Sequence, residues 1–121
     1  MGLSIKPAEW AIQHQPGSNV QATISRAADS GGRHIATALT ATLSGNAAAG
    51  PFTVNLRDGA TGAGTILWSS VIGIVGADSK SISLSNLQIE GTENTAMTLE
   101  FDAAGGSNKE ETVSLIGYTS K

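Results

Sequence analysis

The sequence predicts an all-β fold, an antiparallel β-sandwich of about seven or eight strands. Apolar and polar residues alternate over several short segments, which is typical of strands with one buried face. Clusters of Gly, Asn, Asp and Ser separate these segments. Such residues favour tight turns, because Gly accepts positive φ and the short polar side chains bond to the local backbone.

The alternation is clearest in residues 52–57, where Phe52, Val54 and Leu56 are separated by polar residues. Residues 66–75 are apolar on both faces, which predicts a central strand. The expected strands lie at residues 20–25, 35–43, 52–57, 66–75, 82–84, 97–101 and 113–118.

The stretch from Ala27 to Leu43 leaves a helix open as an alternative, because it contains several alanines. Thr37, Thr40 and Thr42 lie within it, and β-branched residues favour strands. We therefore expect a strand here.

Residues 1–19 differ from the rest, and we expect an extended N-terminal arm there, followed by a β-sandwich domain at 20–121. Pro7 and Pro16 disfavour a regular helix. The arm is either a disordered terminus or a segment that docks on a neighbouring subunit. Candidate contacts to a neighbouring subunit of an assembly are Lys6, Trp10, Ile12 and His14.

Composition narrows the function classes. The net charge is -3, and the seven Lys and Arg residues are scattered, which argues against nucleic-acid binding. No run approaches a membrane span, and no signal peptide is evident. Only 14% of residues are charged, so Ser, Thr, Asn, Gln and Gly must cover the surface. Such a surface suits packing against copies of itself or against a large assembly.

The sequence offers no catalytic or metal-binding motif, so we expect no enzyme and no cofactor. The glycine-rich segment at 58–65 lacks the Lys-Ser/Thr ending of a phosphate loop. We interpret it as a hairpin connection whose exposed tip contains Asp58, Gly59, Thr61 and Gly62.

The remaining polar residues have ordinary interpretations. His14 and His34 are the only histidines and form no metal-binding pair, so we expect no metal site. We expect His34 at a strand end. Glu100 and Asp102 would share the solvated face of one strand.

Three segments, Val54–Ser69, Gly91–Asp102 and Gln21–Ala28 followed by Arg33-His34, resemble small virion proteins of tailed bacteriophages. The resemblance runs from about residue 20 to the C-terminus in the same order, and the closest functional class is the capsid decoration, or cement, protein. It implies a jelly-roll-like sandwich on the outer surface of the head and brings no catalytic residues.

The expected function is therefore that of a structural virion protein, made in the host cytoplasm and bound to the outer surface of the capsid. It would stabilise the head by bridging major capsid proteins, as a homo-oligomeric dimer or trimer. The alternative is a receptor- or glycan-binding module of a tail fibre or baseplate. A small hydrolase is the third hypothesis.

Overall fold

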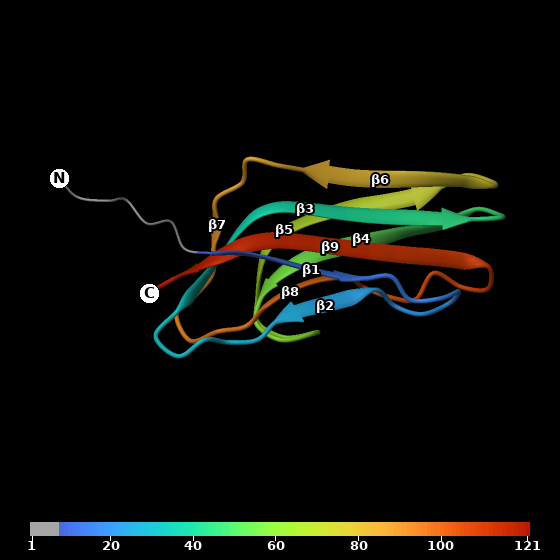
Figure 1. Ribbon diagram of the computed structural model, residues 1–121. Helices are drawn as coiled ribbons and strands as arrows, with labels where there is room; N and C mark the ends of the chain where they lie inside the picture. The colour runs from blue at the N-terminus through green and yellow to red at the C-terminus, as the bar shows by residue number, and fades with distance from the viewer. Residues whose placement is uncertain (1–7) are drawn as a thin grey trace.

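Residues 8–121, which the computed structural model describes, form two antiparallel β-sheets that enclose one hydrophobic core (Figure 1). The strands are β1 (Glu9–His14), β2 (Thr23–Arg26), β3 (Arg33–Gly45), β4 (Ala49–Asp58), β5 (Thr65–Ile74), β6 (Asp78–Leu84), β7 (Ile89–Glu90), β8 (Met97–Phe101) and β9 (Lys109–Ser120). No helix that could cross a membrane lies in this described part of the chain. The predicted all-β sandwich is confirmed.

The strand order identifies the sandwich as a jelly roll. The first sheet has the order β1-β9-β3-β6, with the short β7 also paired to β3, and the second has the order β2-β8-β4-β5. The pairs are nested, because β4 pairs with β5, β3 with β6, β2 with β8 and β1 with β9. Such nesting is obtained when one long hairpin is rolled into two facing sheets.

Alternation along the strands builds the core. In β9, Val113 and Leu115 are fully buried, whereas the intervening Ser114 is only half-buried. Phe101 of the second sheet contacts Phe52 edge to face, with ring centroids 6.4 Å apart. The buried core consists of Ala22, Ala36, Leu39, Ala41, Leu43, Val54, Leu56, Ile72, Ile74, Met97, Leu99, Phe101, Val113 and Leu115.

Of the segment that could have been helical, residues 33–43 lie in the strand β3 (Arg33–Gly45), so the strand predicted at 35–43 is confirmed. His34 lies at its start and is 1% exposed. Its Nε2–H donates to the backbone oxygen of Ala27, and its Nδ1 lies 2.8 Å from the hydroxyl of Thr119. His34 is therefore a hydrogen-bonded core residue at a strand end, as expected.

The prediction that residues 66–75 form a central strand is wrong. β5 is the outermost strand of the second sheet and pairs only with β4. Its inward residues Ile72 and Ile74 are buried, but Val71 is 63% exposed. The apolar outward residues suggested two covered faces, but within the described residues the outward face of β5 is open.

The predicted domain boundary at residue 20 also needs correction. Residues 9–14 form β1, which pairs with β9 over its full length and belongs to the sandwich. The indole of Trp10 lies over Gly117, where a Cβ atom would approach the ring to 2.8 Å. The absence of a side chain at Gly117 therefore leaves the space that the Trp10 ring occupies. Pro16 lies after β1 rather than within it.

Glu111 is an acidic residue of β9 whose side chain is fully buried. Its Oε1 accepts a hydrogen bond from the backbone N–H of Ala22 at 2.9 Å, while Oε2 has no partner within the described residues. Burial raises the pKa of Glu111 to about 7, against the opposing effect of the Ala22 N–H and with a further increase from Asp102.

We expect Glu111 to make the protein less stable as the pH rises. The pKa is about 7 when folded, against an ordinary value of 4.5, so the folded state holds the proton more tightly. The contribution of Glu111 to the free energy of unfolding is complete below its unfolded pKa. It is lost as the pH rises through its folded pKa, which lowers the free energy of unfolding by roughly 3 kcal/mol in total. Glu111→Gln should remove this dependence. Urea denaturation at about pH 5 and about pH 8 measures it, and identical pH dependence in both proteins would contradict the assignment.

Leu56→Ala should lower the free energy of unfolding by about 2–5 kcal/mol, because it leaves a cavity between the sheets. Leu56 is completely buried. The matched control is Val20→Ala, at a 47% exposed position, where a change below about 0.5 kcal/mol is expected. Denaturation midpoints provide the comparison, and equal midpoints would show that Leu56 does not carry core packing.

Candidate assembly surface

The outer face of the first sheet is covered by hydroxyl groups. Thr40 of β3 lies opposite Ser83 of β6 and Ser114 of β9. Leu39 and Ala41, on either side of Thr40, are buried, so the threonine points outward. We call this surface the hydroxyl face, and it consists of Thr40, Thr42, Ser44, Ser81, Ser83, Thr112 and Ser114.

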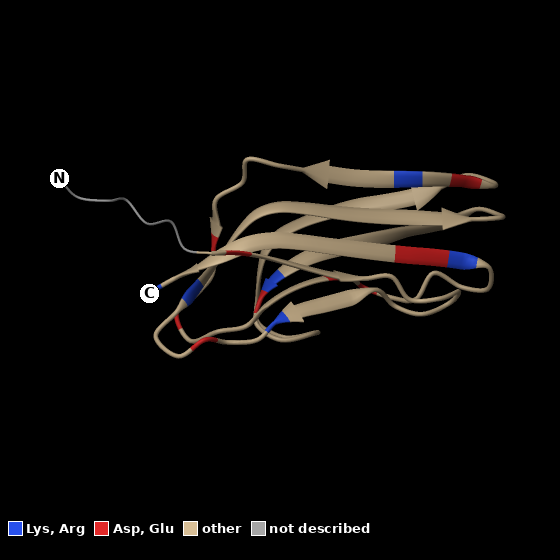
Figure 2. Ribbon diagram, in the orientation of Figure 1, with Lys and Arg blue, Asp and Glu red and all other residues tan. Residues whose placement is uncertain are grey.

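The hydroxyl face is regular and carries no charged side chain in its middle; the exposed Glu110, opposite Ser44, lies at one end. The hydroxyls of Thr42 and Ser81 lie 2.9 Å apart, and Ala11 and Gln13 of β1 extend the face beyond β9. Acidic and basic residues gather toward the two ends of the sandwich, leaving the middle of β3 and β9 without charge (Figure 2). A partner could cover the middle of this face without burying an ionised group.

The predicted contact residues of the arm have mostly intramolecular neighbours. Trp10, Ile12 and His14 are half-buried residues of β1, and Lys6 lies outside the described residues. Ile12 packs against the core, and His14 Nδ1 accepts a hydrogen bond from the backbone N–H of Thr23 at 3.2 Å. A role for these residues as contacts to another subunit stays a prediction.

Trp10 is held to its own domain by three neighbours. Its Nε1–H donates to the Thr119 hydroxyl at 3.1 Å, and its ring meets His34 edge to face at 5.6 Å. The guanidinium of Arg26 lies 5.5 Å from the ring centroid, which is a cation–π distance. In the described structure Trp10 therefore fastens β1 to the sandwich.

The predicted hairpin tip lies folded over the outer face of the second sheet. Thr61 and Gly62 are exposed, but Asp58 and Gly59 are half-buried. The Thr61 hydroxyl lies 3.0 Å from the hydroxyl of Thr23 on β2. The connection is therefore attached to the sheet and does not project freely.

Glu100 holds this loop in place, and its predicted solvated position is wrong. The side chain is only 2% exposed. Its Oε1 accepts from Arg57 Nε at 2.6 Å and from the backbone N–H of Gly62 at 3.0 Å, and its Oε2 accepts from the Thr23 hydroxyl. The alternation correctly placed Glu100 outward, but no sequence pattern indicated that residues 59–64 cover it. Asp102 is exposed, as expected.

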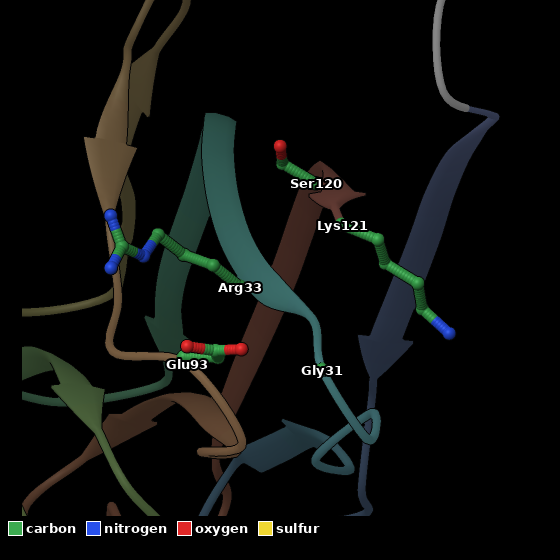
Figure 3. A pocket seen from close by; sticks show the side chains of 5 residues that line it. All are labelled: Gly31, Arg33, Glu93, Ser120 and Lys121. Atoms are coloured by element: carbon green, nitrogen blue, oxygen red, sulfur yellow. The ribbon is translucent and has the colours of Figure 1, made fainter.

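A shallow pocket of about 230 Å³ lies where β3 begins and β9 ends. Arg33 and Lys121 line it, but their side chains point in different directions and do not converge on one point (Figure 3). Within residues 8–121 no group of three His, Asp or Glu residues is placed to hold a metal ion.

Arg57→Met should lower the free energy of unfolding by about 3 kcal/mol, because it leaves the buried Glu100 carboxylate without its cation. Arg33→Met is the matched control, since the Arg33–Glu90 pair is about half exposed on both sides. Breaking that pair should change stability by less than about 1 kcal/mol. Chemical denaturation compares the two, and equal losses would contradict a structural role for Glu100.

Comparisons with known proteins do not assign the chain to a family. No family model matches it, and no curated protein matches it. The coat protein of tobacco streak virus is similar over 97% of this chain and 90% of its own, with 8% identity and a TM-score of 0.39. A protein of Bacillus endospore appendages, which form disulfide-linked pili, is similar over 100% of both chains, with 15% identity and a TM-score of 0.36. At these TM-scores neither likeness carries an inference, and the resemblance to phage decoration proteins stays a prediction.

Proposed function

We propose that the protein is a structural virion protein that decorates the outer surface of a phage head. It would bridge neighbouring major capsid proteins and stabilise the shell, as a homo-oligomer bound on a symmetry axis. The hydroxyl face carries the proposal, because it is a broad and regular surface with an uncharged middle, which suits contact with another protein.

The chemistry of the hydroxyl face favours such a contact. Ser and Thr lose little side-chain entropy when they are covered, in contrast to Lys or Glu. Their hydroxyls can donate and accept, so they can be satisfied by the backbone or side chains of a partner. A decoration protein gains avidity from several simultaneous contacts, and each contact can be modest.

The fold adds a weaker argument by analogy. Jelly rolls occur in viral capsid proteins, and also in lectins and cupins, so the fold alone does not decide the function. A glycan-binding module usually presents exposed aromatic rings, but Trp10, Trp68 and Tyr118 are all half-buried. This burial favours decoration over the receptor-binding alternative.

A lysine placed on the hydroxyl face should weaken attachment to heads by at least about tenfold, because its charge would be buried in the contact. Thr42→Lys and Ser114→Lys are the variants to test. Co-sedimentation with expanded heads purified without this protein measures the binding, and circular dichroism verifies that each variant folds.

Ala60→Lys is the matched control, because Ala60 is exposed on the loop that covers the opposite sheet. It should bind heads as the unmodified protein does. Undiminished binding of both face variants would remove the hydroxyl face from the contact. Failure of the unmodified protein to bind, combined with specific binding on a glycan array, would favour the tail module instead.

A further inference from the structure

We propose that the open edge of β5 pairs with β5 of a second copy, so that two four-stranded sheets join into one continuous sheet. This dimer surface lies on the second sheet and is separate from the hydroxyl face. The inference does not depend on capsid binding, and its test needs no capsid.

The backbone of β5 supplies the first argument. β5 is ten residues long and is hydrogen-bonded only to β4, so its other edge presents free N–H and C=O groups. The other outer strands are β1, which has six residues and begins with Glu9, β2 and β6. β2 has only four residues, and β6 carries Asp78 and Lys80.

The side chains supply the second argument. The described residues include four exposed large hydrophobics, and three of them lie on or directly after β5. Ile66 is 48% exposed, Val71 63% and Val75 93%, whereas Val20 lies elsewhere. Apolar side chains gathered along an unpaired edge are typical of an interaction site.

The absence of charged residues along β5 indicates that the strand pairing with it is β5 of a second copy. No charged residue occurs from Gly59 to Ala77, so β5 and its flanking turns are neutral. A two-fold antiparallel pairing places the residues beside the axis next to their own copies, so a charge there would meet a like charge. The neutral β5 avoids that repulsion, and an antiparallel strand is its own complement in backbone hydrogen bonding.

The regular part of β5 locates the centre of the pairing. The pairing with β4 shifts register between Leu56 and Arg57 and again between Ala49 and Phe52, near the two ends of β5. Residues 68–72 between these irregularities follow an unbroken register. We place the two-fold axis within this stretch, close to Ser69 and Val71.

Val71→Lys should weaken dimerisation at least about tenfold, because it sets two like charges beside the axis. Val20→Lys makes the same change at an exposed valine away from β5 and should leave the dimer intact. Sedimentation equilibrium over a range of concentrations measures both. An unmodified protein that is monomeric throughout, or equal effects of the two variants, would overturn the proposal.

Single cysteines test the geometry directly, because the chain contains no cysteine of its own. With the axis between them, Ser69 lies opposite Val71 of the second copy. A mixture of Ser69→Cys and Val71→Cys should therefore form an intermolecular disulfide on mild oxidation more readily than either variant alone, since directly opposed residues of paired strands have Cα atoms within bonding range. Ser83→Cys on β6 is the control and should form little. A dimer that cross-links no better at β5 than at β6 would refute β5 pairing and would leave the head-binding proposal untouched.

Discussion

The antiparallel register of β3 and β9 is the constraint on which the rest of the structure depends. The two strands pair from Arg33 and Ser120 to Gly45 and Lys109, through the centre of the first sheet. This register places the apolar residues of both strands on the core side and their hydroxyls outside. A slip by one residue would reverse both faces, exposing the core residues and burying the hydroxyls.

Buried polar groups attach the outer parts of the molecule to this centre. Glu111 of β9 accepts the N–H of Ala22 and so fixes the chain that enters β2. Glu100 performs the same task for the β4–β5 loop through Arg57 and Gly62. Trp10 of β1 donates a hydrogen bond to Thr119 and packs against His34, and these contacts attach β1 to the first sheet. In a protein with few charges, most of the buried polar contacts therefore maintain the architecture.

The sequence predicted where the strands lie far better than it predicted which strands pair with one another. Alternation located β4, β8 and β9, because period two depends only on which face is buried. It could not reveal that β5 lies at an edge, since strand order is decided by pairings distant in sequence. Pro7 and Pro16 suggested an arm, and no pattern within residues 9–14 could show that β1 pairs with β9, about a hundred residues away. The burial of Glu100 was equally hidden, since the loop that covers it comes from another hairpin.

Composition alone indicated that small polar residues cover the surface, but it did not indicate where they gather. A low charged fraction required a surface of small polar residues, but only the register of β3, β6 and β9 gathers them into one continuous patch. That patch and the neutral edge of β5 lie on different sheets. One molecule could therefore contact a shell through the first sheet and a second copy through the other.

An electron-microscopy reconstruction of the virus particle that carries this chain tests the central claim most directly. We expect a jelly roll on the outer surface of the head, with β3, β6 and β9 turned toward the capsid. Density for this chain in the tail or baseplate, or a hydroxyl face turned to solvent on the head, would contradict it.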